Sequence, residues 1–120
     1  MRLRKTLVTA LALALTLVAA PSPADTSRVR ATDSRQWRPG FRHIVKGDRI
    51  VWKNPTSTSH TVTAYQGPWS KNTTVSPGGR TSRKFRRRGT YLYRCMTPGH
   101  SSLTGGECNG MCGEIHVTRR

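Results

Sequence analysis

Short β-forming runs separated by turn residues extend over most of the sequence and limit its fold more than any other feature. Residues 49–53 lie between Gly47-Asp48 and Asn54-Pro55, and their alternation puts Ile50 and Trp52 on one face. Similar runs are found at residues 29–32, 43–45, 61–64, 83–85, 90–95 and 115–117, with Gly or Pro turn signals between them. No segment beyond residue 24 has a helical period. The sequence therefore predicts an all-β sandwich with its apolar faces turned inward.

The N-terminal segment has the pattern of an export signal. Arg2, Arg4 and Lys5 precede an uninterrupted run of Leu, Ala, Val and Thr over residues 7–20. This run is shorter than the about 20 residues needed to span a bilayer, and small residues follow it. We predict a signal peptide over residues 1–24, cleaved after Ala24, a secreted or extracytoplasmic location, and a folded domain over residues 25–120. A retained membrane anchor is the alternative.

The composition limits both size and partners. At 120 residues with 34% hydrophobic residues, the chain has material for one small core, and a multidomain enzyme is excluded. The net charge of +16 comes from 21 Lys and Arg against 5 Asp and Glu, so the preferred neighbours are anionic. Nucleic acid is not expected, because aromatic residues are not interleaved with the charges.

Residues typical of a soft metal site gather near the C-terminus. Alternation puts Tyr91, Tyr93 and Cys95 on one side of their strand, and His100 follows Cys95 at a spacing of five residues. Met111 comes further along the same stretch. A thiolate, an imidazole and a thioether select copper rather than calcium or magnesium. His60 would supply the second imidazole of a trigonal blue-copper site.

These motifs resemble those of a known family, the small cupredoxins related to plastocyanin, pseudoazurin and azurin. The resemblance covers nearly the whole chain beyond the signal segment. It is carried by the ordered set Trp37-Arg38-Pro39, Gly47-Asp48-Arg49-Ile50-Val51-Trp52-Lys53-Asn54, His60-Thr61-Val62, Pro77-Gly78-Gly79, Gly89-Thr90-Tyr91-Leu92-Tyr93-Arg94-Cys95 and Gly110-Met111-Cys112-Gly113-Glu114-Ile115. It implies a Greek-key β-sandwich that binds one type 1 copper ion.

The resemblance also implies the ligands. His60, Cys95 and His100 match the three equatorial ligands, and Met111 matches the weak axial ligand. Where the azurin pattern would place its methionine, this chain has Thr104. The segment between His100 and Met111 is longer than the ligand loop of plastocyanin or azurin.

Two further cysteines, Cys108 and Cys112, flank Met111 and are absent from the basic pattern of the family. In an oxidising compartment we expect them to form a disulfide, which leaves Cys95 as the odd thiolate for copper. The alternative makes them extra Cu(I) or zinc ligands together with His100 or His116.

The resulting prediction is a monomeric, secreted blue-copper protein that carries one electron at a time and is not an enzyme. Its partner would be a redox protein with an acidic docking surface, and anionic polymers of the cell envelope are a second candidate. Two alternatives stay open. One is a copper-delivery or copper-buffering protein with the same ligands, and the other is a basic, metal-free interaction module.

Overall fold

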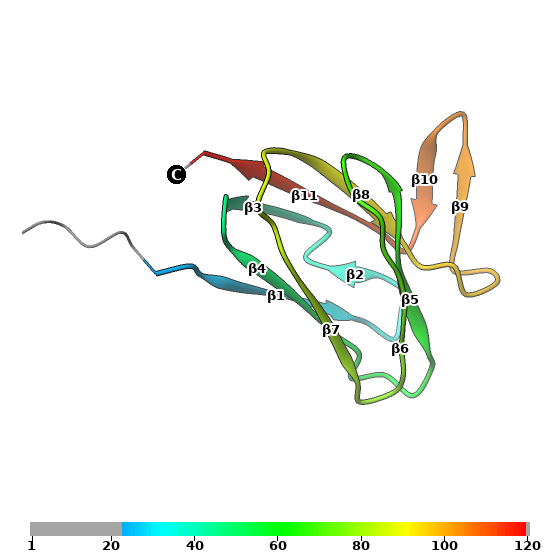
Figure 1. Ribbon diagram of the computed structural model, residues 1–120. Coiled ribbons are helices and arrows are strands. Elements are labelled where there is room, and N and C mark those ends of the chain that lie inside the picture. The colour runs from blue at the N-terminus through cyan, green and yellow to red at the C-terminus, as the bar shows by residue number, and fades with distance from the viewer. Residues whose placement is uncertain (1–22, 120) are drawn as a thin grey trace, which may run out of the picture.

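Two β-sheets packed face to face make up the fold of residues 23–119, which are the residues that the computed structural model describes (Figure 1). The predicted signal peptide falls mostly outside this range. The described residues contain strands, turns and loops and no helix, so the predicted all-β sandwich is confirmed. None of them forms a helix long and apolar enough to cross a membrane.

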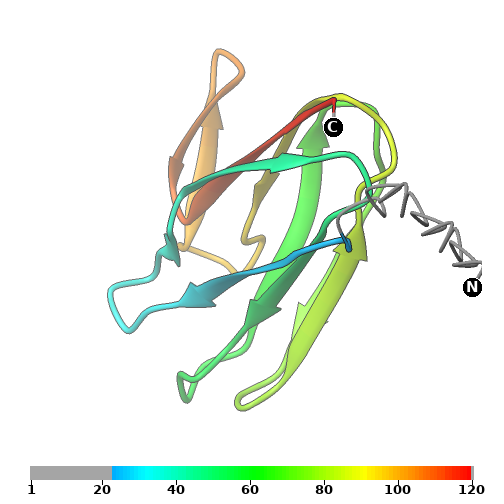
Figure 2. The ribbon, with the colours of Figure 1, turned by 90° about the vertical axis from the view of Figure 1, so that its left-hand side faces the viewer.

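The strands, in chain order, are β1 (Thr26–Ala31), β2 (Trp37–Arg38), β3 (Phe41–Val45), β4 (Arg49–Lys53), β5 (His60–Gln66), β6 (Asn72–Val75), β7 (Arg80–Lys84), β8 (Gly89–Arg94), β9 (Ser101–Thr104), β10 (Glu107–Gly110) and β11 (Cys112–Thr118). One sheet has the order β2-β1-β4-β7, and the other has the order β3-β11-β8-β5-β6. Strands β9 and β10 form a separate hairpin. Figure 2 shows the two layers from the side.

Each sheet contains one parallel pair among antiparallel neighbours. Strand β1 runs parallel to β4, and β11 runs parallel to β3. Strand β8 lies at the centre of the larger sheet, paired with both β11 and β5. Because β8 ends at Arg94, the residue that follows emerges from the middle of the sandwich at one end.

The core lies between the sheets and is rich in aromatic side chains. Trp52 is fully buried and packs edge to face against Tyr93, with ring centroids 5.4 Å apart. Trp69, which lies on a loop, stacks on Trp52 and closes one side of the core. Tyr91 and Cys95 are also buried, so the side of the strand that they were predicted to share with Tyr93 faces the core. Such aromatic contacts add to the stabilisation that comes from burying apolar area.

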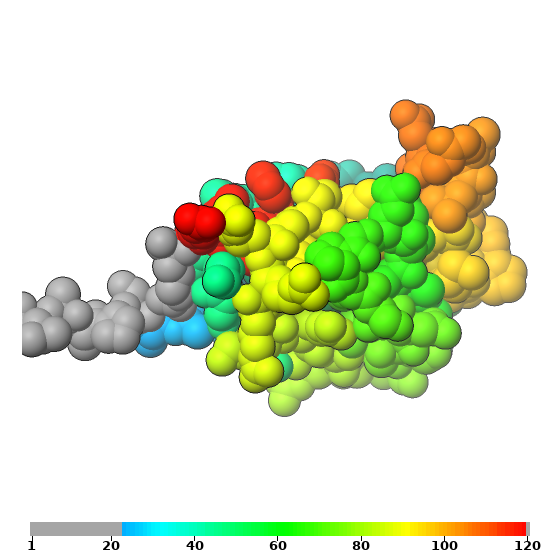
Figure 3. Space-filling view, turned by 45° about the horizontal axis from the view of Figure 1, so that its top comes forward, coloured from blue at the N-terminus to red at the C-terminus, as the bar shows by residue number. Residues whose placement is uncertain are grey.

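The sequence pattern missed four strands. Strands β2 and β6 are short, and β9 and β10 are exposed on nearly every residue. The long segment expected between His100 and Met111 is therefore a hairpin that projects from the end of the molecule (Figure 3). Gly105 and Gly106 form its tip with φ angles of 58° and 83°, which suits a tight two-residue turn.

Candidate metal centre

Three chain segments converge at the end of the sandwich where β8 stops. His60 is the first residue of β5, and Cys95 directly follows β8. His100 ends a turn in which its backbone N–H donates to the Thr97 carbonyl, 3.0 Å away, immediately before β9. The pairing of β5 with β8 brings the first two segments together, and the turn folds His100 back over them.

The donor atoms of these three residues form a compact triangle. The two Nδ1 atoms of His60 and His100 lie 3.2 Å apart. Cys95 Sγ lies 3.8 Å from Nδ1 of His60 and 3.6 Å from Nδ1 of His100. All three side chains are buried, and within the described residues they form the only group of three or more His, Cys, Asp or Glu side chains close enough to share a metal ion.

A hydrogen-bond network fixes the tautomer of His60. Its Nε2 lies 3.0 Å from the Thr56 hydroxyl. That hydroxyl has one proton, which it donates to Asn54 Oδ1 at 2.6 Å or to the Thr58 carbonyl at 3.1 Å. It therefore accepts a hydrogen bond from His60 Nε2–H. The lone pair on Nδ1 is left facing Cys95 and His100, which is the form of imidazole that binds a metal.

The sulfur of Cys95 is fixed by strand β5 and by the turn that follows Cys95. The backbone N–H of Thr61 donates to Sγ at 3.3 Å, and Thr97 Oγ1 lies 3.3 Å from the same atom. The Thr97 hydroxyl also donates to the Ser59 carbonyl, and the backbone N–H of Met96 donates to Thr61 Oγ1. These bonds tie the Cys95 turn to the His60 strand, so the triangle is already formed in the folded chain.

Met111 is fully buried beside the triangle. Its backbone N–H donates to the His100 carbonyl at 2.8 Å, and its carbonyl accepts the backbone N–H of Cys95 at 2.9 Å. Met111 is thus bonded through its backbone to two of the three donor residues. Gly110, the residue before Met111, permits this close approach: it has a φ of 95°, and a Cβ there would lie 2.4 Å from the His100 carbonyl oxygen.

Burial affects the protonation of both imidazoles. Desolvation lowers the pKa of His60, and the proximity of His100 and Arg35 lowers it further. The pKa of His100 is also lowered, first by desolvation and then by Arg35. Burial penalises the charged form of a histidine, and neighbouring positive charge adds to that penalty. Both rings are therefore held in the neutral form that can coordinate a metal.

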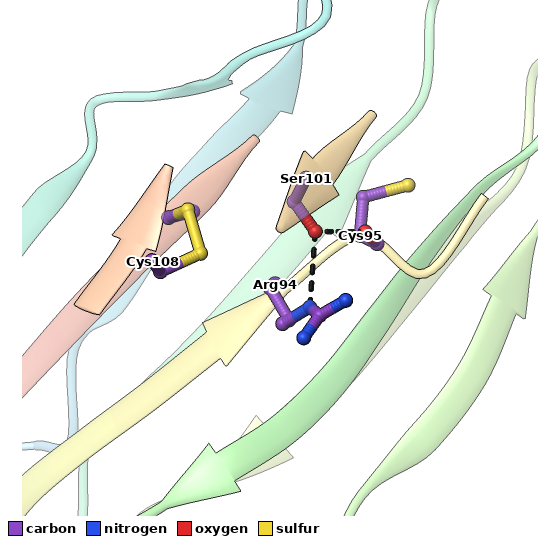
Figure 4. The surroundings of a disulfide bond; sticks show 5 residues. Arg94, Cys95, Ser101 and Cys108 are labelled. Atoms are coloured by element: carbon purple, nitrogen blue, oxygen red, sulfur yellow. Dashed lines mark hydrogen bonds between the residues drawn. A yellow bond between two sulfur atoms is a disulfide. The ribbon is translucent and has the colours of Figure 1, made fainter. Parts of the chain in front are cut away.

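The hairpin that follows His100 is anchored next to the triangle. Cys108 on β10 and Cys112 on β11 form a disulfide, as expected, so they are not available as extra ligands. The Ser101 hydroxyl donates to the Cys95 carbonyl, and Arg94 Nε donates to the Ser101 hydroxyl at 3.0 Å (Figure 4). The base of the hairpin is thereby fixed to the end of β8.

Three other His and Met side chains of the folded domain are exposed, unlike those of the triangle. Met96 adjoins Cys95 in sequence, but its side chain is 49% exposed. His43 and His116 are exposed on neighbouring strands of the outer sheet face, with ring centroids 5.6 Å apart. Sequence reasoning missed Thr56 and Asn54, because hydrogen bonds between polar loop residues follow no periodic pattern.

No protein-family model and no curated protein matches the sequence. Solved structures match its fold. A purple cupredoxin from Nitrosopumilus maritimus is 17% identical, with a TM-score of 0.61, over 77% of this chain and 99% of that chain. A reduced mutant of amicyanin is 19% identical, with a TM-score of 0.62, over 83% of this chain and 87% of that chain. The Cu-containing nitrite reductase of Thermus scotoductus is 21% identical, with a TM-score of 0.61, over 84% of this chain and 23% of that chain.

These neighbours include two small cupredoxins and one domain-sized part of an enzyme, so the fold alone is shared by proteins of different activity. The donor triangle adds evidence for a metal site, which the fold alone does not give. Metal–nitrogen bonds of about 2.0 Å and metal–sulfur bonds of about 2.3 Å at trigonal angles put the donors about 3.5 to 3.7 Å apart, close to the distances found here. The chain therefore has the cupredoxin fold, with a His-Cys-His triad at one end that is consistent with a small blue copper protein.

Proposed function

We propose that this protein is an extracytoplasmic type 1 copper protein that carries single electrons. The observation that supports this most directly is the buried triangle formed by His60, Cys95 and His100, whose donor atoms lie within 3.8 Å of one another. Two imidazoles and one thiolate form the donor set of blue-copper sites. Those residues would bind one copper ion.

Met111 is the proposed axial ligand. Its burial and its backbone bonds to both His100 and Cys95 support this role. A thioether in that position is a long and weak contact that adjusts the reduction potential. The equatorial residues would then provide most of the binding free energy.

The chemistry that a bound copper ion supplies is a one-electron change between Cu(II) and Cu(I), with the electron taken from a reduced partner protein and passed to an oxidised one. This chain's residues would keep the donor atoms of His60 and Cys95 nearly fixed during that change. Thr56 orients His60, and Thr61 and Thr97 contact the sulfur of Cys95. Because these contacts exist in the folded chain, little rearrangement accompanies the transfer. Fast electron transfer requires such rigidity.

The surroundings of His100 support an electron pathway at this end of the molecule. His100 lies on a turn, and with His60, Thr56 and Arg35 it lines a hollow of about 230 Å³. Met96 and Leu103, on either side of it in the sequence, are exposed apolar residues. Exposed apolar side chains that surround a buried site are typical of surfaces where proteins meet. A redox partner would dock here.

The disulfide supports the location. Cys108 and Cys112 are four residues apart and joined, and such bonds persist in secreted and extracytoplasmic proteins rather than in the cytosol. The sequence pattern of residues 1–24 supports export as well.

The test is the visible spectrum of the protein, expressed from the full-length sequence and loaded with one equivalent of Cu(II). We expect an intense band in the red region that ascorbate bleaches, together with a reversible couple in voltammetry. Cys95→Ser should abolish the band. The matched control, Cys108→Ser with Cys112→Ser, should keep it, because those sulfur atoms are joined to each other.

Other outcomes would separate the alternatives. If the protein is colourless but still binds Cu(I) tightly, copper delivery or buffering would be its function, in place of electron transfer. Failure to bind copper in either oxidation state would leave a metal-free module on a cupredoxin fold. A fully blue Cys95→Ser protein would exclude the thiolate assignment.

A further inference from the structure

The end of the sandwich opposite the metal centre has a concentration of positive charge. Five cationic side chains line one hollow of about 420 Å³, and we call this group the basic pole: Arg49, Arg83, Lys84, Arg86 and Arg87. None of the described residues that line this hollow has a carboxylate. All five are at least partly exposed. An anion in the hollow would meet positive charge from several directions.

The backbone of the basic pole is fixed. Phe85 is buried, its N–H donates to the Asp48 carbonyl at 2.9 Å, and its carbonyl accepts the N–H of Gly47 at 2.7 Å. The Tyr91 hydroxyl donates to the Arg87 carbonyl at 2.6 Å. The segment that contains the arginines is therefore anchored on both sides, and it needs little ordering when a ligand binds.

Two of the cations are themselves positioned by neighbouring groups. Arg49 donates through Nη1 to the Ser82 hydroxyl at 3.0 Å, in line with the pairing of β4 and β7. Arg83 donates through Nη1 to the Ser70 carbonyl, and its guanidinium lies over the Trp69 ring at 5.8 Å. A guanidinium has five donors, so each side chain has further N–H groups available to a ligand.

The nearest buried carboxylate is already engaged with backbone groups. Asp48 is 5% exposed, and its two carboxylate oxygens accept the N–H groups of Asp25 and Val45. Asp48 does not line the hollow. No carboxylate among the described residues that line the hollow offsets the charge of the basic pole there.

The basic pole and the metal centre lie at opposite ends of β8. Gly89 begins this strand next to the arginines, and Arg94 ends it next to Cys95, so about 17 Å separate the two ends at the usual rise of a strand. In Figure 1 the β7–β8 connection lies at the left, near the C-terminus, and the β9–β10 hairpin lies at the right. A ligand on the basic pole would leave the His100 end uncovered.

The two ends also differ in apolar exposure. Among residues 23–119, the exposed large apolar side chains are Phe41, Met96 and Leu103, and none of them lines the basic pole. Protein interfaces are commonly centred on buried apolar or aromatic anchors, and insertion into a lipid bilayer needs apolar side chains that can enter it. The basic pole offers neither, which disfavours both a protein partner and a lipid surface.

We propose that the basic pole binds a linear, phosphate-bearing polymer and so tethers the protein with its metal centre facing away from the polymer. The planar guanidinium matches two oxygens of one phosphate group, and four of the five cations are arginines. A flexible chain can follow the hollow and place successive phosphates against successive side chains. Binding of the polymer depends on the charge and shape of the basic pole, so it does not require bound copper.

The experiment measures binding of fluorescently labelled linear polyphosphate to the copper-loaded protein, by anisotropy at several salt concentrations. The variant Arg86→Gln/Arg87→Gln should bind roughly tenfold more weakly, and its salt dependence should flatten because fewer counterions are released. The matched control is Arg30→Gln/Arg38→Gln, which removes the same charge from two exposed residues that pair across β1 and β2. It should weaken binding less than about threefold.

Three results would overturn the proposal. Equal weakening in both double variants would show that net charge alone attracts the polymer. Tighter binding of polyglutamate of the same length would indicate an acidic protein partner. Tighter binding of vesicles that contain an anionic phospholipid would indicate a membrane surface. Metal-free protein should bind polyphosphate as the copper-loaded protein does, so failure of the copper assignment would leave this measurement interpretable.

Discussion

At the metal centre, the orientation of the His60 ring depends on one hydroxyl group. The Thr56 hydroxyl accepts a hydrogen bond from His60 Nε2–H at 3.0 Å and donates its own to Asn54 Oδ1 or to the Thr58 carbonyl. Asn54 is in turn fixed by its Nδ2 group, which donates to two carbonyls. The tautomer of His60 is thus set by Thr56 and Asn54, which are not themselves proposed ligands.

Thr56→Val tests this dependence, because valine has nearly the same shape and lacks the hydroxyl. We expect copper affinity to fall by about 10-fold to 100-fold, since groups that orient a metal-binding histidine contribute effects of that size. Competition with a chelator of known affinity measures the change. Thr56→Ser keeps the hydroxyl and should keep the affinity. Unchanged affinity in the valine variant would contradict the role given to Thr56.

The second test at this level concerns Met111. Replacing it with leucine removes the thioether but keeps an apolar side chain in the buried space. The blue band should persist, and the reduction potential should rise, because a lost donor destabilises Cu(II) more than Cu(I). Voltammetry measures the potential. Met96→Leu is the matched control, since that side chain is exposed and should leave the potential unchanged.

The β9–β10 hairpin connects His100 to Met111, and it depends on glycine at one close approach. Gly110 has a φ of 95°, and a Cβ on it would lie 2.4 Å from the His100 carbonyl oxygen. The same carbonyl accepts the N–H of Met111. Strand β10 can therefore return to the triad only if residue 110 has no side chain.

Gly110→Ala should lower the free energy of unfolding by about 2 kcal/mol or more, from strain at positive φ and from the clash with backbone. Urea denaturation of the metal-free protein measures the loss. Gly105→Ala, at the hairpin tip, also has a positive φ but meets nothing within 4 Å. It should cost less, about 1 kcal/mol. Equal losses in the two variants would show that the approach to His100 is not the cause.

The strands were predictable from the sequence where one face is buried. The alternation of Tyr91, Tyr93 and Cys95 predicted that they share one side of their strand, and all three side chains are buried. Strands β9 and β10 escaped prediction because exposure on both faces leaves no alternating pattern. The residues of the donor triangle were named from the family resemblance and from donor chemistry. The hydrogen bonds of Thr56 with Asn54 and His60 were not predicted, because a hydrogen bond between loop side chains depends on their placement in three dimensions.

The metal-binding residues and the concentrated positive charge lie at opposite ends of the molecule. The triad end combines buried neutral imidazoles with exposed Met96 and Leu103, whereas the opposite end presents the basic pole. The disulfide and the projecting hairpin both belong to the triad end. Binding at one end can therefore proceed without blocking the other, which is what a tethered electron carrier would need.

The stability of the metal-free protein should depend on pH through the two buried imidazoles. Folding lowers the pKa of His60 and of His100 below the ordinary value of 6.5. Below pH 6.5 the unfolded chain therefore binds protons that the folded chain does not, and stability is lost as the pH falls from 6.5 through the lowered values. Bound copper should stabilise the folded protein and extend this loss to lower pH, because it binds only the neutral rings and keeps the folded chain from taking up protons there.

Urea denaturation of the metal-free protein at intervals between about pH 5 and 8 measures this dependence, in a range where carboxylates stay ionised. Arg35→Gln is the informative variant, because the charge of Arg35 helps to lower the pKa of both rings. Its removal should raise both pKa values and make the loss of stability shallower. A free energy of unfolding that stayed constant or rose from pH 7 to pH 5 would mean that the unfolded chain gains no protons there relative to the folded one. The two rings would then not be kept neutral by burial, and the triad would lack the preorganised form from which metal binding is inferred.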